Sequence, residues 1–299
     1  MTEAAAFRPR AFAWILAARP GTLSLSLSPV AAGAAIAWAE THRLRWPAVL
    51  VAGLAAALIQ IGTNLHNDAA DFRRGGDGPA RLGPARATAS GLLSAEDVSR
   101  GALVCFAVAA AAGFYLAAVG GWPILLIGLV SIACGLAYSS GPCPIAYTPF
   151  GELFVLAFFG LAAVGGVGWL ACGHIGLASL VAGAALGLFA AAVLLVNNHR
   201  DRVEDARVGR HTLAIAIGPE ASRWLYASLM LSPFALLVPL ARLLPDANVA
   251  PALLSLPLAL LAVVRFFREP AGPGLNAQLG LTAHVQLAFA LLICIGAVA

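Results

Sequence analysis

Long uncharged stretches constrain the fold of this sequence more than any other feature. Nine apolar stretches are about as long as a helix needs to be to cross a bilayer. They lie at residues 20–39, 47–66, 96–119, 122–140, 150–170, 176–197, 221–243, 250–268 and 282–299. Charged residues make up only 11% of the chain, too few to cover the surface of a soluble domain. The sequence therefore predicts an all-α, polytopic membrane protein with about nine transmembrane helices.

The basic residues indicate how the helices are oriented. All 18 of them are arginine. If the N-terminus is cytoplasmic, 15 lie on the cytoplasmic side, and only Arg43, Arg45 and Arg242 lie outside. Cytoplasmic loops carry such an excess of basic residues. The net charge of +4 thus reflects topology, and we expect no nucleic-acid partner.

Five of the seven aspartates lie in two short segments, each directly after an apolar stretch. Asp68, Asp71 and Asp77 follow the second stretch, and Asp201 and Asp205 follow the sixth. If these helices continue beyond the membrane, spacings of three and four residues place each pair on one helix face. Like charges at such spacings repel each other. A bound cation between the two pairs would remove this repulsion, so both segments are predicted to face one cytoplasmic site.

The candidate ligands are oxygen atoms, which suit Mg²⁺, Mn²⁺ or Ca²⁺ better than zinc. Mg²⁺ typically takes one or two carboxylates together with phosphate oxygens. We therefore predict Mg²⁺, with Mn²⁺ as a substitute, bound by Asp68, Asp71, Asp201 and Asp205. Nearby arginines suit the remaining phosphate charge, and these are Arg73, Arg74, Arg200 and Arg210. The combination predicts a site for a metal-bound polyphosphate.

The two acidic segments are alike, which suggests an internal repeat. Both open with asparagine, carry two aspartates and follow a long apolar stretch. We interpret residues 1–299 as one domain with two four-helix units, at about 20–140 and 150–268, and a ninth helix at 282–299. His66, His199 and His211 lie in these segments, but their spacing is not that of zinc ligands. We interpret them as ordinary polar residues of solvent-exposed loops.

These segments resemble the aspartate-rich motifs of the UbiA superfamily of intramembrane aromatic prenyltransferases. The resemblance covers almost the whole chain and is strongest to the branch that prenylates 1,4-dihydroxy-2-naphthoate in menaquinone biosynthesis. It is carried by Asn67-Asp68-x-x-Asp71, Asp77, Arg81-Leu82-Gly83-Pro84, Ser90-Gly91, residues 138–166, Asn197-Asn198-x-Arg200-Asp201-x-x-x-Asp205 and Gly209-Arg210-x-Thr212-Leu213. The chain departs from the branch in having arginine for common lysines at Arg73, Arg74 and Arg210, and in the small pair Ala69 and Ala70.

The resemblance implies a fold, a reaction and a location. It implies a UbiA-like bundle in the bacterial inner membrane, with a cytoplasm-facing active site. It implies Mg²⁺-dependent transfer of a polyprenyl group from polyprenyl diphosphate to 1,4-dihydroxy-2-naphthoate, with decarboxylation to demethylmenaquinone. It also places Asp77, Asn197 and Asn198 among the substrate-binding residues.

Several polar residues near the motifs have two interpretations. Asn64 and Asn67 are either metal or diphosphate contacts or helix caps. Arg19, beside Pro20, either meets an anionic substrate or reaches the membrane interface. Tyr138 and Tyr147 are either cation-stabilising or acceptor-orienting rings, or interface tyrosines. Glu152 stands in an uncharged segment, where ionisable residues are often functional, so we place it near the acceptor.

The sequence has features in common with three other functional classes. A transporter also has repeats and anion sites, but its ionisable groups commonly lie within broken spans, whereas these aspartates gather on one face. A prenyltransferase for 4-hydroxybenzoate or homogentisate shares the same two motifs. A CDP-alcohol phosphotransferase needs an Asp-Gly-Ala-Arg pattern, which this sequence lacks.

Overall fold

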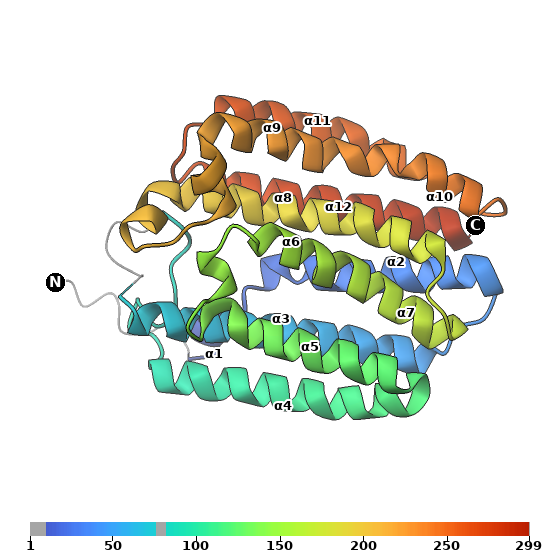
Figure 1. The fold of residues 1–299 in the computed structure, drawn as a ribbon, viewed down its shortest axis with the longest axis horizontal. Helices are drawn as coiled ribbons and strands as arrows, with labels where there is room; N and C mark the ends of the chain where they lie inside the picture. The colour runs from blue at the N-terminus through green and yellow to red at the C-terminus, as the bar shows by residue number, and fades with distance from the viewer. Residues whose placement is uncertain (1–9, 76–81, 299) are drawn as a thin grey trace.

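The computed structural model describes residues 10–75 and 82–298, and in these ranges the regular structure is helical. The long helices are α2 (Ser24–Thr41), α3 (Trp46–Arg73), α4 (Ala95–Gly120), α5 (Trp122–Ser139), α8 (Leu177–Arg207), α9 (Leu213–Ala235) and α12 (Leu275–Val298). The shorter helices are α1 (Arg10–Ala18), α6 (Gly151–Leu156), α7 (Ala163–Cys172), α10 (Leu237–Leu243) and α11 (Leu256–Arg268). Figure 1 shows most of these helices running side by side in one bundle.

The described residues contain eight helices that are long and apolar enough to cross a membrane, or nine if a bent pair counts as one span. This confirms the prediction of a polytopic membrane protein with about nine spans. The bent pair is α1 and α2, which meet at 49°. The sequence predicted one helix from residue 20, and the structure differs because Arg19 adopts a left-handed conformation (φ 55°) just before Pro20. The two-repeat organisation stays a prediction.

α8 is the central helix of the bundle. It is the most buried of the spans and packs against α2, α9 and α12. It also packs against a π-helical turn, Ala157–Ala162, that joins α6 to α7. Gly160 in this turn lies so close to the Gly183 carbonyl and Gly187 of α8 that a Cβ atom would clash. Glycine is therefore required where the two backbones meet.

Both acidic segments lie on helices at the same end of the bundle. α3 continues to Arg73 and α8 to Arg207, so each aspartate pair falls on a helix, as predicted. Figure 1 shows these two helix ends, and the start of α9, at the end where the N-terminus lies. The C-terminus lies at the opposite end. We call the first of these the motif end of the bundle.

Candidate active site

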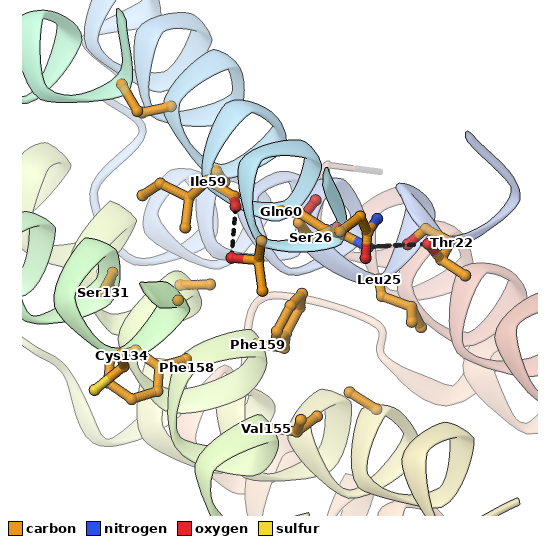
Figure 2. Close-up of a pocket in the computed structure, with 18 of the residues that line it drawn as sticks. Thr22, Leu25, Ser26, Ile59, Gln60, Ser131, Cys134, Val155, Phe158 and Phe159 are labelled. Atoms are coloured by element: carbon orange, nitrogen blue, oxygen red, sulfur yellow. Dashed lines mark hydrogen bonds between the residues drawn. The ribbon is translucent and has the colours of Figure 1, made fainter. Parts of the chain in front are cut away.

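A large apolar cavity runs through the bundle and reaches the motif end. It has a volume of about 770 Å³ and is lined mainly by α3 and α5, with further residues from α4, α7 and α8. Figure 2 shows part of its wall, where Phe158 and Phe159 face Ile59 and Gln60. The lining on α3 extends from Ala52 to Asn67, which at 1.5 Å per residue spans about 22 Å. The cavity is long and mainly apolar, and it reaches a group of polar side chains at the motif end.

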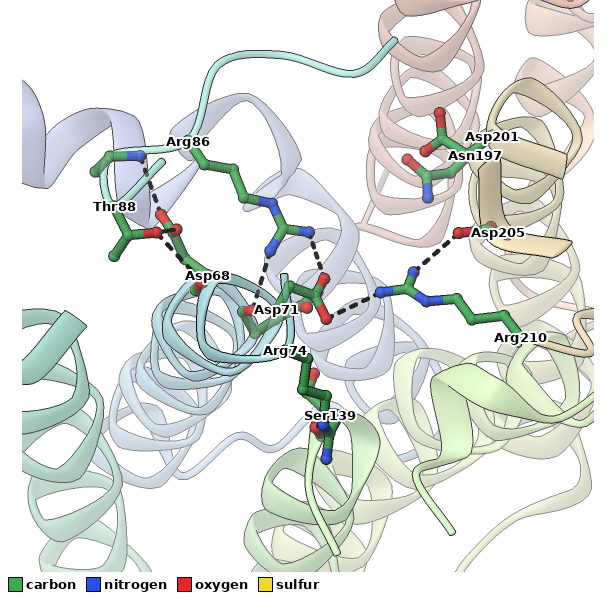
Figure 3. A network of polar contacts seen from close by, with 12 residues as sticks. Asp68, Asp71, Arg74, Arg86, Thr88, Ser139, Asn197, Asp201, Asp205 and Arg210 are labelled. Carbon is green, nitrogen blue, oxygen red and sulfur yellow. Dashed lines mark hydrogen bonds and ion pairs between the residues drawn. The ribbon is translucent and has the colours of Figure 1, made fainter. Parts of the chain in front are cut away.

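The first aspartate of the first motif is held by the segment that follows α3. The Asp68 carboxylate accepts a hydrogen bond from the Ala87 backbone N–H (3.1 Å) and another from the Thr88 hydroxyl. Asp68 is only 1% exposed. Residues 82–94 therefore fold back over the first motif and fix this carboxylate, as Figure 3 shows.

An arginine bridges the two aspartate motifs. Arg210 Nη2 donates to Asp71 Oδ1 at 2.9 Å, and Arg210 Nη1 donates to Asp205 Oδ1 at 3.2 Å. The other carboxylate oxygen of Asp71, Oδ2, accepts a hydrogen bond from Arg86 Nη2 at 2.8 Å. Figure 3 shows this row of alternating charges between α3 and α8. The structure thus brings together Asp71, Asp205 and Arg210, whereas the sequence predicted that Arg210 meets phosphate.

The two carboxylates determine the ionisation of Arg210. Burial opposes its charged form, but Asp71 and Asp205 outweigh burial and raise the pKa of the Arg210 guanidinium above its usual range. Arg210 is therefore a permanent cation between the motifs. The Arg210 guanidinium also lies over the aromatic ring of Tyr147, with 4.9 Å between the guanidinium carbon and the ring centroid.

The Tyr147 ring contacts arginines. Arg74 lies over the same ring at 5.4 Å, and it also donates to the Ser139 carbonyl. The described cation contacts of Tyr147 are thus to Arg74 and Arg210. Arg73 is exposed and donates to the Ala95 carbonyl at 3.4 Å, so its side chain extends toward the start of α4.

Arg200 is buried and holds the polar side chains of the second motif together through hydrogen bonds. Its guanidinium donates to Asp201 Oδ1 (2.8 Å), Asn197 Oδ1 (2.8 Å) and Asn276 Oδ1 (2.7 Å). Asn276 in turn donates to the Leu82 carbonyl at 3.0 Å. These contacts tie α8 to α12 and to the segment after the first motif. The sequence predicted that Arg200 meets phosphate, whereas its side chain is 1% exposed and directed at these protein groups.

Polar residues of α3, α5 and the break after α1 line the motif end of the cavity, among them Arg19, Asn64, Asn67 and Tyr138. Asn64 and Asn67 lie inside α3, so the interpretation as helix caps is wrong. Asn64 Nδ2 donates to the Ala18 carbonyl at 3.0 Å, which holds α1 against α3. Tyr138 lines the cavity from α5.

Glu152 lies buried beside the second motif. Asn198 Nδ2 donates to Glu152 Oε1 at 2.9 Å and joins α6 to α8. Within the described part of the chain, the other carboxylate oxygen has no hydrogen-bond partner. Of the remaining predicted site residues, Asp77 lies outside the described residues, as does Arg81 of the family signature.

Comparison with known proteins identifies the family. The model of the UbiA prenyltransferase family matches residues 26–297, nearly the whole chain. The chain belongs to this family. Two relatives are both named 1,4-dihydroxy-2-naphthoate octaprenyltransferase. The Mycobacterium tuberculosis protein is 37% identical over 73% of this chain and 74% of its own. The Mycobacterium leprae protein is 33% identical over 93% of each chain.

A solved structure shares the fold of this family member. It is a UbiA homolog from Archaeoglobus fulgidus bound to DMAPP and Mg²⁺, with a TM-score of 0.63 and 16% identity. The alignment covers 95% of this chain and 99% of the other. The multi-pass helical bundle of this chain therefore has the same fold as that UbiA homolog.

The residues present fit a divalent cation that is shared with a phosphate ligand. The donors are carboxylate and amide oxygens, which suit Mg²⁺. Among the described residues, no three carboxylate, imidazole or thiol groups converge on one point. Mg²⁺ sites in phosphate-handling enzymes need only one or two carboxylates, because phosphate and water supply the other ligands. Asp201, whose side chain is 18% exposed, is more accessible than Asp71 (3%) and Asp205 (9%).

The sequence did not identify three residues of this network. Arg86, Thr88 and Asn276 contact the motifs from segments that carry no aspartate. Arg86 is only 6% exposed, which is unusual for an arginine. The sequence does not show which arginines are buried, so it gave no reason to single out Arg86. Asn276 lies close to the predicted start of the ninth helix, where a polar residue resembles an ordinary helix end.

Proposed function

We propose that this protein transfers a polyprenyl group from polyprenyl diphosphate to 1,4-dihydroxy-2-naphthoate and releases carbon dioxide. The observation that carries this proposal is the position of the two aspartate motifs. They are linked through Arg210 beside the polar end of a long apolar cavity. An isoprenoid tail suits the apolar cavity, and a diphosphate suits the charged end. The names of the relatives support the naphthoate as acceptor.

The charged end holds the leaving group. We propose Asp68, Asp71, Asp201 and Asp205 as ligands of Mg²⁺, with Mn²⁺ as a substitute. When bound, the cation neutralises part of the diphosphate charge. Arg73, Arg74 and Arg210 supply further positive charge where the leaving diphosphate develops negative charge. Arg200 and Asn197 keep Asp201 in position through the buried hydrogen bonds described above.

The reaction exchanges a carbon–oxygen bond for a carbon–carbon bond. The allylic C–O bond breaks, and the diphosphate leaves with the electron pair. The electron-rich ring attacks the allylic cation through the carbon that bears the carboxylate. The bond to the carboxylate then breaks, carbon dioxide leaves, and its electron pair restores the aromatic ring. The product is demethylmenaquinone in its hydroquinone form, since no oxidant takes part.

This route requires water exclusion more than a strong base. The apolar walls of the cavity protect the cation from water. We propose that Arg19, Asn64, Asn67 and Tyr138 hold the acceptor at the polar end, since all four line it. We further propose that the hydrogen bond between Glu152 and Asn198 shapes this end by joining α6 to α8, and that Tyr147 positions Arg74 and Arg210. Asp77 is proposed to contact the diphosphate.

A competition assay tests the choice of acceptor. Membranes that contain the protein receive Mg²⁺, a polyprenyl diphosphate and equal amounts of the naphthoate, 4-hydroxybenzoate and homogentisate. We expect the naphthoate to be consumed preferentially, with one carbon dioxide released per prenyl group transferred. Membranes with the Asp205→Asn variant provide the background. Prenylation of 4-hydroxybenzoate with its carboxylate retained would show that the acceptor is wrong, although the enzyme class is right.

We also propose that the motif end faces the cytoplasm of a bacterial inner membrane. Arginine is concentrated at this end, as the positive-inside rule requires. Single cysteines at Val208 (motif end) and His174 (opposite end) test this in a background without the native cysteines. In intact cells, we expect an impermeant thiol reagent to label His174→Cys but not Val208→Cys. The reverse labelling would invert the proposed topology.

A further inference from the structure

His199, inside the second motif, belongs to a cluster that the proposed reaction does not use. We interpreted it from the sequence as loop polarity, but it lies within α8 and is only 1% exposed. Its ring contacts Phe266 of α11, with centroids 5.0 Å apart. Phe266 also contacts Tyr226 of α9, with centroids 4.3 Å apart. Rings from α8, α9 and α11 thus form a cluster of aromatic contacts between these helices, which we call the aromatic floor.

Two arginines lie one helical turn beyond this floor. Arg202 follows His199 by three residues on α8, and Arg223 precedes Tyr226 by three residues on α9. Residues three apart share a helix face. α8 runs toward the motif end and α9 runs away from it, so both arginines are nearer to that end than the rings. α8 and α9 pack against each other, so the two arginines lie on neighbouring helices at this end of the bundle.

Within the described residues, Arg202 and Arg223 have no carboxylate partner. In the ranges 10–75 and 82–298, no carboxylate forms an ion pair with Arg202 or Arg223. Three of the buried nitrogens here have no hydrogen-bond partner, namely Arg202 Nη1, Arg223 Nε and His199 Nδ1. Glu204, on the same helix as Arg202, is paired with Arg207 at 2.6 Å. Partly buried cations without partners are costly, so this arrangement favours an external anion.

The surroundings place the arginines at the depth of lipid headgroups. Trp224, next to Arg223, is 62% exposed and packs edge-on against Phe267 at 5.0 Å. Exposed tryptophan is typical of the membrane–water interface. Arg265 and Arg268, in the last turn of α11, add positive charge at the same end. Basic pockets between transmembrane helices on the cytoplasmic side bind anionic headgroups.

We propose that Arg202 and Arg223 bind the phosphate of an anionic phospholipid at the motif end of α8, α9 and α11. A guanidinium pair suits phosphate oxygens better than a pair of ammonium groups does. The site is separate from the reaction cavity, because His199, Arg202 and Arg223 are not among the residues that line that cavity. The bound lipid would hold α9 and α11 against the helix that carries the second aspartate motif.

Lipid retention measures this binding directly and does not depend on the reaction. The purified protein is incubated with an equimolar mixture of phosphatidylglycerol and phosphatidylcholine, and the retained lipids are counted by native mass spectrometry. One arginine near an anionic surface contributes about fivefold in affinity. The R202Q/R223Q variant should therefore lose about 30-fold in preference for phosphatidylglycerol. The R10Q/R100Q variant removes the same charge from exposed sites at the same end, and should retain the preference.

Further measurements distinguish a lipid headgroup from free inorganic phosphate and control for misfolding of the variant. Excess inorganic phosphate should leave the lipid bound, because a headgroup is also anchored by its acyl chains. Complete displacement by inorganic phosphate would show a site for a soluble anion and overturn the lipid proposal. An unchanged lipid preference in R202Q/R223Q would also overturn it. If the double variant does not fold, each single variant should lose about fivefold, and R202K/R223K should retain most of the preference.

Discussion

Replacing Asp71 by asparagine should cause the largest loss of any single substitution in this protein. Asp71 is 2% exposed and receives Arg86 on one oxygen and Arg210 on the other. The change leaves two largely buried arginines without this charge, and removing one partner of a buried pair costs about 3–5 kcal/mol of stability. It also removes a proposed metal ligand, so we expect kcat/KM to fall by roughly 10²–10³.

Thermal unfolding and prenyl-transfer assays of the purified variant measure the two effects separately. Asp97→Asn is the matched control, because Asp97 pairs at 3.3 Å with an exposed arginine, Arg10, at the same end of the bundle. Its loss should stay within about 1 kcal/mol, as for other surface ion pairs. We expect Asp68→Asn, Asp201→Asn and Asp205→Asn to lose activity as well. Full activity in any variant of the two motifs would refute a shared metal-diphosphate site.

Replacing Arg210 by glutamine should produce the second largest effect. Arg210 is the only described side chain that donates to aspartates of both motifs, and without it Asp71 and Asp205 lose the cation between them. The loss of one preorganised charge in an active site typically lowers kcat by about 10²–10³. Arg210→Lys should retain most of this activity, since it preserves the charge and the naphthoate branch commonly has lysine here.

Steady-state kinetics with varied prenyl diphosphate test this prediction. Arg207→Gln is the control, because Arg207 is exposed at the end of α8 and, among the described residues, pairs only with Glu204 three residues away. We expect the control to stay within about twofold of the wild type, as a surface pair contributes little. Equal activity in Arg210→Gln and Arg207→Gln would show that the bridge between the motifs has no part in the reaction.

The sequence by itself determined the helical membrane bundle and its two acidic motifs. A hydrocarbon environment leaves a backbone without water to bond to, so long apolar stretches such as 47–66 and 176–197 must form helices. Spacing within a helix is also local, and it correctly placed Asp68 with Asp71 and Asp201 with Asp205 on α3 and α8. Shared motifs of this kind were sufficient to recognise the family.

Only the tertiary structure decided how these motifs are held. Arg210 reaches Asp71 across 139 residues, and Asn276 reaches Leu82 across 194. Contacts between residues this far apart in the sequence leave no repeating pattern from which they could be predicted. The same reason explains why Arg200 and His199, which look like exposed motif residues in the sequence, are buried. Helix propensity and hydropathy act along one segment, whereas burial and ion pairing depend on which helices pack against each other.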